Sequence, residues 1–428
     1  MDTVKQEKSN VLVIAVMFLL FFMIAFVTNF AGSMGVIVKT QFGASNALSQ
    51  LGTLANFIAY ACFGIPVGLI LKRRGYKFTS LLATIVGFVG VGIQFASGYV
   101  DPSIAFGIYV LGAFVAGISM CLLNTTVNPM LNTLGGGGNR GNQLIQFGGS
   151  CNSIGGTIAP ILLGYLIGGS VQTAKVNDAA PAMIIAMAIF ALAFLIILLA
   201  RIPEPHMETA DERAARLSGD TKKDPHGPMS FRHFVLGAIA IFFYVGIEVG
   251  IPNTANLYMS NLEWVGPVVA GTLVGFYWFL MMCGRLVGGA VGGRVSSKTM
   301  LTTVSLLATV FLLCLIFIPE DVRFSIPVIG AEVPLGMVFM FLCGLCTSVM
   351  WGAIYNLAAE GLGKYTPLAS GIFMALVCGG GVISFIQNLV ADKVGFISSY
   401  WVIIAGLCYL LFYALVGSKN VNRDIPTE

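Results

Sequence analysis

Charged residues are scarce in this chain. Asp, Glu, Lys and Arg account for 10% of its 428 residues and hydrophobic residues for 57%, whereas a soluble globular protein is about 25% charged. The chain length alone would suggest two or three soluble domains, but this composition excludes them. The mean hydropathy of +0.88 and the 52 glycines are typical of membrane-spanning helices, in which small residues allow close packing.

The apolar runs also lack the residues of catalysis or metal binding. The three histidines, His206, His226 and His233, lie in or beside one hydrophilic segment, which excludes a histidine proton relay in the membrane. Cys343 and Cys346 form a single C-x-x-C without the second pair or nearby histidine of a metal site, so we interpret them as packing residues. We predict no enzyme activity, no metal and no cofactor.

Twelve apolar stretches are long enough to cross a bilayer as helices, which takes about 20 residues. They are 11–38, 47–71, 78–99, 104–133, 142–168, 180–201, 232–259, 265–292, 299–318, 334–358, 366–391 and 397–417. We therefore predict an all-α membrane protein with twelve transmembrane helices in two pseudo-symmetric six-helix bundles. The first bundle is 1–201, a cytoplasmic linker is 202–231, and the second bundle with a short cytoplasmic tail is 232–428.

Positive charge predicts the orientation of these helices, because loops rich in Lys and Arg stay in the cytoplasm. With both termini inside, all of the 23 Lys and Arg residues except Lys39, Lys175, Arg323 and Lys393 fall on the cytoplasmic side. We expect a multi-pass protein of the plasma membrane, the bacterial inner membrane, with both termini in the cytoplasm.

Glu248 is the only carboxylate well inside an apolar stretch, in the run 242–250. A charge at membrane depth costs several kcal/mol unless it is paired, hydrated or protonated, so such acids are usually functional. We interpret Glu248 as the proton-coupling residue of a transporter. The alternative is a structural hydrogen-bonding group or a direct ligand of the substrate.

Amide side chains at membrane depth predict a binding site between the halves. An amide offers both donors and acceptors, which suits a neutral ligand with many hydroxyls better than an anion. Each amide alone could equally form a hydrogen bond between helices. The candidate substrate-binding amides are Asn29, Asn56, Asn124, Asn128, Gln146, Asn152, Asn253, Asn256, Asn356 and Gln387.

Three aromatic residues, Trp278, Trp351 and Tyr355, are further candidates for substrate binding. The C–H face of a sugar can pack on an indole ring while its hydroxyls reach amides, which matches the mostly apolar lining of ligand sites. Trp351 and Tyr355 are four residues apart and so share a helix face. Core or lipid packing is the alternative for both tryptophans.

Two loops repeat Gly, Arg and Lys at matching offsets, Gly68–Lys77 after the second span and Gly289–Lys298 after the eighth. Parallel repeats of this kind place the substrate site between the halves near the middle of the membrane. We predict a cytoplasmic gate in which Glu360 pairs with Arg285 or Arg294, with charges that only set the topology or snorkel to the headgroups as the alternative. The gate candidates are Arg73, Arg285, Arg294 and Glu360.

Proline and glycine also predict breaks in three spans. Pro252 is expected to interrupt the seventh span, Pro129 the fourth, and the run 379–381 of three glycines the eleventh. Such breaks are tolerated where neighbours or a cavity satisfy the freed backbone. We expect them to act as hinges or as points of close packing.

The two repeated loops resemble the cytoplasmic signature of the major facilitator superfamily, although Lys72 stands where an acidic residue is usual. Residues 123–135, 152–155, 244–248 and 357–365 resemble the fucose–proton symporter family of sugar transporters. The resemblance implies a twelve-helix facilitator fold that imports a hexose or 6-deoxyhexose with a proton, or with sodium in some relatives. It also implies that Asn152 contacts the sugar.

The chain departs from that family at two positions. The fucose symporters carry a proton-linked Asp in helix one and a Glu in helix four, where this chain has Gly32 and Asn124. Glu248 matches a glutamate of the glucose- and galactose-type members, which favours those sugars over fucose.

We therefore predict a secondary active transporter that imports a neutral monosaccharide by proton symport with alternating access. A facilitative uniporter, favoured by the two missing acids, and a sodium-coupled symporter are the alternatives. A membrane sensor is disfavoured because the segment 202–231 is too short for a signalling domain. We expect a sugar and the lipid bilayer as partners, no nucleic acid because the net charge of +4 is unclustered, and a monomer.

Overall fold

The protein is almost entirely helical. The computed structural model describes residues 2–134, 138–167, 174–204, 207, 226–291, 295–327, 330–362, 365–422 and 424–426. The first half contains α1 (Asp2–Ser33), α2 (Gly35–Gln41), α3 (Asn46–Ser49), α4 (Leu51–Ala96), α5 (Pro102–Leu134), α6 (Gly138–Ile167) and α7 (Ala180–Leu199). The second half contains α9 (Arg232–Ser260), α10 (Gly266–Val291), α11 (Ser297–Phe317), β1 (Arg323–Ile326), β2 (Ala331–Pro334), α12 (Leu335–Thr347), α13 (Met350–Ala359), α14 (Thr366–Leu376), α15 (Gly379–Val394) and α16 (Phe396–Phe412), which continues as a π turn (Tyr413–Gly417).

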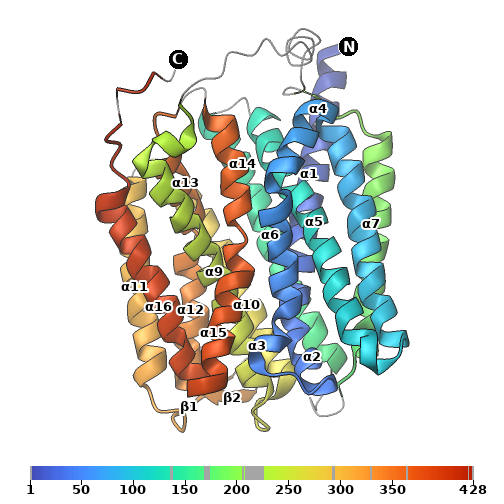
Figure 1. The fold of residues 1–428 in the computed structure, drawn as a ribbon, viewed down its shortest axis with the longest axis vertical. Coiled ribbons are helices and arrows are strands. Elements are labelled where there is room, and N and C mark those ends of the chain that lie inside the picture. The colour runs from blue at the N-terminus through green and yellow to red at the C-terminus, as the bar shows by residue number, and fades with distance from the viewer. Residues whose placement is uncertain are drawn as a thin grey trace.

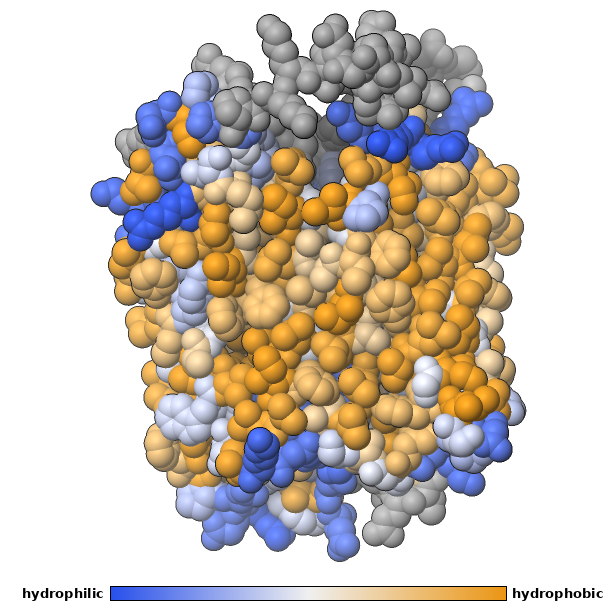
Figure 2. Space-filling model, viewed as in Figure 1, coloured by the Kyte–Doolittle hydropathy of each residue, from blue (hydrophilic) through white to orange (hydrophobic). Residues whose placement is uncertain are grey.

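The helices α1–α7 lie on one side of the molecule and α9–α16 on the other (Figure 1). We call the end that carries both chain termini the termini end. The opposite end, with the antiparallel strands β1 and β2, is the hairpin end. The face seen in Figure 2 is apolar across its middle, and its hydrophilic residues gather at the two ends, as a bilayer requires.

The predicted twelve spans are confirmed. Eleven helical segments of the described residues are long and apolar enough to cross a membrane, and one of them, α4, has 46 residues. At 1.5 Å per residue it would be about 70 Å long, more than twice a hydrocarbon core of about 30 Å. A kink at Gly75, whose φ of 82° favours glycine, divides α4 into the predicted second and third spans.

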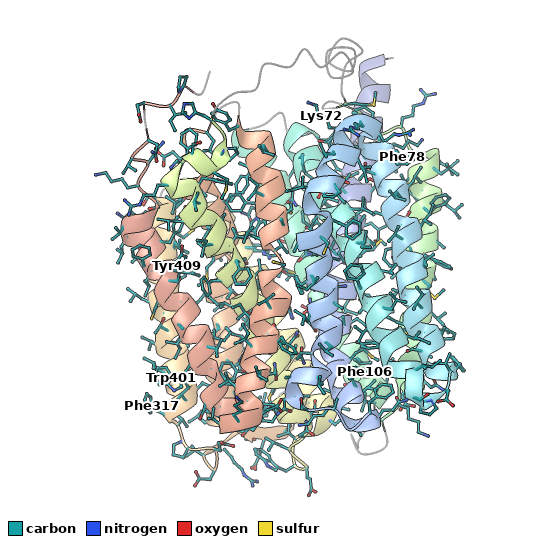
Figure 3. The ribbon with its side chains drawn as sticks, in the orientation of Figure 1. Lys72, Phe78, Phe106, Phe317, Trp401 and Tyr409 are labelled. Atoms are coloured by element: carbon teal, nitrogen blue, oxygen red, sulfur yellow. The ribbon has the colours of Figure 1, made fainter. Side chains whose placement is uncertain are left out.

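Exposed aromatic and basic side chains mark the two ends of the spans. Near the hairpin end, Phe317 and Trp401 meet edge to face with ring centroids 6.4 Å apart (Figure 3). Lys72 is exposed near the termini end (Figure 3). Aromatic residues are enriched where a membrane protein meets the headgroups, so this arrangement agrees with the span boundaries.

The breaks in the helices differ from the predicted ones. Pro252 and Pro129 lie inside continuous helices, α9 and α5, so the predicted interruptions there are wrong. The eleventh span does break, between α14 and α15, directly before the three glycines at 379–381. The tenth span breaks between α12 and α13 without any proline, and neither this break nor the hairpin of β1 and β2 was predicted.

The two halves meet along α6 and α10, and along α4 with α14 and α15. A close approach occurs at Gly271 of α10, where a Cβ would lie 2.4 Å from the backbone oxygen of Pro160. At the hairpin end, the Asp392 carboxylate accepts hydrogen bonds from the backbone N–H groups of Asn46 and Ala47, at 2.8 and 2.9 Å. These contacts hold the halves together at the hairpin end.

Candidate functional site

Glu248 of α9 and Arg285 of α10 form a buried ion pair. Arg285 Nη2 lies 3.3 Å from Glu248 Oε1, and each side chain is 12% exposed. Among the described residues the other ion pair, Arg323 with Glu332, lies in the exposed hairpin. The charge of Glu248 at membrane depth is therefore compensated by an arginine, as burial of a charge requires.

Arg285 also connects the two halves of the protein. Its Nη1 donates to the backbone oxygen of Gly149 at 2.6 Å and to Ser153 Oγ at 3.0 Å, both on α6 of the first half. The guanidinium fork thus binds the Glu248 carboxylate with one nitrogen and α6 with the other.

Two tyrosines and a threonine surround the ion pair. The Tyr244 hydroxyl lies beside the Glu248 carboxylate and the Arg285 guanidinium. It donates to the backbone oxygen of Thr347 at 3.2 Å. The Tyr277 hydroxyl lies 3.2 Å from the backbone oxygen of Glu248 and 3.1 Å from Thr347 Oγ1. Helices α9, α10 and α12 therefore converge on the charged pair through hydroxyl groups.

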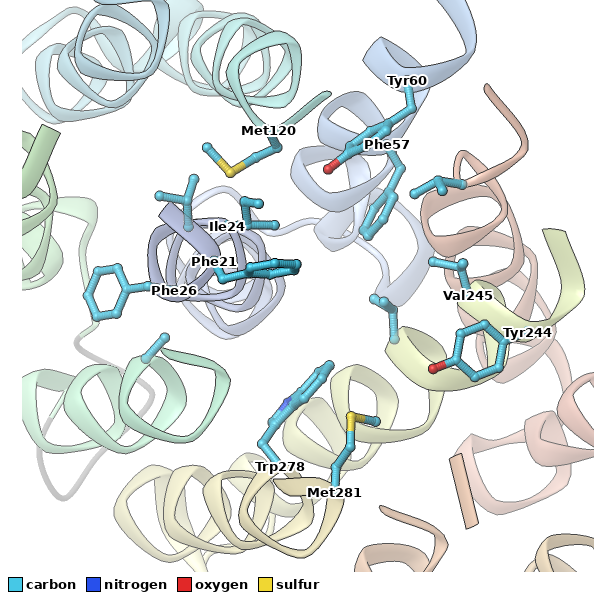
Figure 4. Packing of buried hydrophobic residues seen from close by; sticks show 14 of the residues in the cluster. Phe21, Ile24, Phe26, Phe57, Tyr60, Met120, Tyr244, Val245, Trp278 and Met281 are labelled. Carbon is cyan, nitrogen blue, oxygen red and sulfur yellow. The ribbon is translucent and has the colours of Figure 1, made fainter. Parts of the chain in front are cut away.

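Aromatic side chains from both halves point toward one another in the core. Phe21 of α1, Phe57 of α4 and Trp278 of α10 converge where the halves meet (Figure 4). Trp278 packs over Gly156 of α6, where a Cβ would lie 2.9 Å from the indole. Its Nε1 has no hydrogen-bond partner among the described residues. This donor is available to a ligand on an aromatic surface.

The amides of the first half mainly bind neighbouring protein groups. Asn152 Nδ2 donates to the backbone oxygen of Phe21 at 2.9 Å, which joins α6 to α1. Two further amides reach other helices: Asn56 donates to the backbone oxygen of Ala113, and Asn124 donates to the Tyr60 hydroxyl. The other two bond within their own helices, Asn29 to the backbone oxygen of Ala25 and Asn128 to that of Asn124. Each side chain keeps a second polar atom, and the Asn56 oxygen is buried and unpaired among the described residues.

The amides of the second half have fewer protein partners. Gln387 of α15 is fully buried, and neither of its amide atoms has a partner among the described residues. The same holds for Nδ2 of Asn253, which packs against Gly32 of α1 so closely that a Cβ there would lie 2.4 Å from its Oδ1. Asn256 lines a small crevice with Ser33 of α1. Buried amides without partners are costly, which favours a polar ligand at this position.

The remaining substrate-binding candidates lie on α13 or face it. Trp351 packs near Tyr244 with ring centroids 6.1 Å apart, and Tyr355 packs near Phe373 at 5.5 Å. Gln146 of α6 faces α13, since its Nε2 lies 3.7 Å from the position of a Cβ on Gly352. Asn356 is exposed.

The Arg285–Glu360 pair predicted for the gate does not form in this structure, and the alternative pairing of Glu360 with Arg294 lies outside the described residues. Arg285 pairs with Glu248 and not with Glu360, which is exposed and contributes its backbone oxygen to a 2.9 Å contact with His233 Nε2. Arg285 lies beside the deeper acid in this structure, and a gate at Glu360 stays a prediction. Arg73 is exposed beside the Gly75 kink of α4, and Arg294 lies outside the described residues.

The sequence identifies Glu248 as a functional residue but does not identify the residues that surround it. It assigns Arg285 to the gate and does not single out Tyr244, Ser153 or Thr347. One signal was available for Arg285: it and Glu248 are the only opposite charges placed inside predicted spans and away from their ends. An acid at membrane depth calls for a cation at the same depth.

Two bundles of membrane-spanning helices, with a buried charged pair in one of them whose arginine also binds the other, are typical of a polytopic transporter built from two halves. The chain belongs to the Major Facilitator Superfamily, whose family profile matches residues 16–385. It is a member of a family of transporters and not an enzyme.

Relatives and solved structures agree with this assignment. The chain is 30% identical to a glucose/galactose transporter of Brucella abortus over 94% of this chain and 93% of that protein. It is 23% identical to the L-fucose-proton symporter of Escherichia coli over 95% and 93% of the two chains. Its fold matches a fucose symporter structure in the outward conformation with a TM-score of 0.66 at 19% identity, covering 96% and 100% of the chains. A D-xylose-proton symporter structure matches with a TM-score of 0.73 at 14% identity, covering 96% and 98%.

Proposed function

We propose that this protein imports a neutral monosaccharide, a hexose or 6-deoxyhexose, together with a proton. The buried pair of Glu248 and Arg285 between the halves carries the coupling part of this proposal. The unpaired amide groups of Gln387 and Asn253 support a ligand with many hydroxyls. The named activities of the glucose/galactose and fucose relatives support a sugar.

Proton uptake by Glu248 does not leave Arg285 without hydrogen-bond partners. Removing one partner of a buried ion pair is costly because the other charge is left without compensation. When Glu248 takes up a proton, Arg285 keeps its bonds to the Gly149 oxygen and the Ser153 hydroxyl. The cation therefore shifts from a bridge between α9 and α6 to a ligand of α6, so the charge of Glu248 changes how the halves are joined.

We further propose that both termini lie in the cytoplasm, which places the hairpin end outside the cell. The halves are joined at that end through Asp392 and the start of α3. The structure then corresponds to a state closed to the outside, from which sugar and proton leave toward the cytoplasm.

The test of coupling is Glu248→Gln in proteoliposomes, with Glu332→Gln as the matched control. Both glutamates pair with an arginine at 3.3 Å, but Glu332 is exposed in the hairpin. We expect Glu248→Gln to abolish accumulation of radiolabelled D-glucose or D-galactose driven by a proton gradient, while exchange between equal sugar concentrations continues. Glu332→Gln should leave both activities unchanged. Undiminished accumulation in Glu248→Gln would refute the coupling.

A uniporter is the second candidate, and one observation favours it. Asn124, where the fucose symporters carry an acid, forms a neutral hydrogen bond with Tyr60 at 2.7 Å. If the wild-type protein equilibrates sugar but never concentrates it in a proton gradient, the uniporter is correct. Accumulation that follows a sodium gradient alone would indicate sodium coupling.

A further inference from the structure

The tenth span is discontinuous, and a tyrosine of α9 binds the broken backbone. Helix α12 ends at Thr347 and α13 begins at Met350. In a continuous helix, the Thr347 carbonyl would accept a hydrogen bond from the N–H of Trp351. Here the Tyr244 hydroxyl donates to that carbonyl at 3.2 Å. Tyr244 therefore satisfies a buried acceptor at the end of α12.

The same hydroxyl has a competing acceptor, because it lies beside the Glu248 carboxylate. A phenol has a single proton to donate. Its 3.2 Å bond to Thr347 is longer than the usual range of about 2.5–3.0 Å for O–H···O bonds. An ionised carboxylate is a stronger acceptor than a backbone oxygen, whereas a protonated one loses that advantage. The charge of Glu248 thus decides which acceptor the hydroxyl binds.

We propose that Tyr244 is a positioning residue that transmits the protonation of Glu248 to the break in the tenth span. This inference rests on the proposed proton coupling at Glu248. With Glu248 ionised, the hydroxyl turns toward the carboxylate and the Thr347 carbonyl is released. With Glu248 protonated, the hydroxyl holds the carbonyl and fixes the angle between α12 and α13.

The moving part is α13, because α12 is anchored independently. The Tyr277 hydroxyl lies 3.1 Å from Thr347 Oγ1, and this oxygen in turn donates to the Cys343 oxygen of α12 at 3.1 Å. Neither contact involves the Glu248 carboxylate. Helix α13 carries Trp351, whose ring centroid lies 6.1 Å from that of Tyr244. A change at the break therefore moves a candidate sugar-binding aromatic residue in response to a proton.

The test compares Tyr244→Phe with Tyr400→Phe. Both tyrosines are fully buried and donate to a backbone oxygen, Tyr244 to Thr347 and Tyr400 to Ile251 at 3.0 Å, but Tyr400 lies on α16. The measurement is D-glucose accumulation by proteoliposomes as a function of pH. We expect Tyr244→Phe to move the pH midpoint upward by about one unit, because the ionised carboxylate loses a hydrogen-bond donor. Tyr400→Phe should keep the wild-type midpoint. An equal midpoint in the two variants would overturn the proposal.

A spectroscopic measurement on the wild-type protein keeps the test open if Tyr244→Phe does not fold. The emission of Trp351, obtained as the difference between wild type and Trp351→Phe, should change with pH at the midpoint of uptake, and this change should vanish in Glu248→Gln. Emission that is constant across that midpoint would overturn the proposal.

Glu248→Gln separates failure of this inference from failure of the proposed function. Loss of accumulation in Glu248→Gln together with an unshifted midpoint in Tyr244→Phe would refute the role of Tyr244 alone. Undiminished accumulation in Glu248→Gln would refute the coupling and, with it, the role of Tyr244.

Discussion

At the scale of single residues, the arrangement depends on the forked guanidinium of Arg285. One nitrogen binds the Glu248 carboxylate, and the other binds the Gly149 oxygen and the Ser153 hydroxyl. A lysine ammonium is a compact charge without this planar fork, so it could not reproduce both sets of bonds. The chemistry of one side chain thus joins the titratable group to the opposite half.

The energetic link between Glu248 and Arg285 is measurable in a double-mutant cycle. Arg285→Gln leaves the carboxylate buried without its cation and should destabilise the protein by roughly 3–5 kcal/mol. Glu248→Gln should cost less, because Arg285 keeps two acceptors on α6. The double variant, which buries two neutral amides, should recover most of the loss. Thermal unfolding in detergent gives the three values, and purely additive losses would show that the pair does not act as a unit.

Single residues also show what could be predicted from the sequence. The depth of Glu248 followed from its position in an apolar run, so its selection required no structure. The partner of Arg285 did not follow, because depth along a helix does not say which way a side chain faces. For the same reason Asn152, whose amide joins α6 to α1, could not be distinguished from Gln387, whose amide has no partner among the described residues.

At the scale of elements, span positions were predictable but breaks were not. A length of about 20 apolar residues fixes a span, and the twelve predicted stretches agree with the observed helices. Pro252 failed as a signal because one missing N–H can be tolerated inside a spanning helix when neighbours compensate. The sequence offers only a weak signal for the break after Thr347. The hydroxyls of Thr347 and Ser348 donate to backbone oxygens of their own helix, and such bonds often bend a helix.

The close contact between α4 and α15 is an element-scale feature that we expect to tolerate little change. A Cβ on Gly381 would lie 2.8 Å from Leu54 Cα, so Gly381→Ala should destabilise the protein by about 1–3 kcal/mol through overpacking. Gly371→Ala is the matched control, because a Cβ on Gly371 in α14 meets nothing within 4 Å and alanine is the better helix former. Thermal unfolding of both variants checks this expectation. A Gly381→Ala protein as stable as Gly371→Ala would mean that the two helices separate easily.

At the scale of the whole molecule, the contacts that cross between the halves determine the conformation. Those at the hairpin end include the carboxylate of Asp392, which reaches Asn46 and Ala47 from the other half of the chain. Lys39 lies nearby, with its ammonium 5.2 Å from the centre of the Phe396 ring. The proposed transport by alternating access requires these contacts to break whenever the hairpin end opens.

Asp392→Asn should therefore favour the state that is open at the hairpin end. Charge-assisted bonds from a carboxylate to backbone N–H groups are about twice as strong as neutral ones, and an asparagine offers a single neutral acceptor in their place. The opening can be measured by electron–electron distance spectroscopy between spin labels at Ser45 and Lys393, both exposed at this end, in a background without the native cysteines. We expect a larger fraction of long distances in Asp392→Asn than in the wild-type protein.

Asp101→Asn is the matched control for this measurement. The Asp101 carboxylate also accepts a backbone N–H at a helix start, that of Ser103 at 2.9 Å, but donor and acceptor belong to the same half. Its loss should weaken the start of α5 without changing the distance between the labels. If both variants open the hairpin end equally, the effect is a general loss of negative charge. If neither variant opens the hairpin end, helix packing such as that at Gly381 and Gly271 maintains the closed state, and the Asp392 hydrogen bonds form as a consequence of closure.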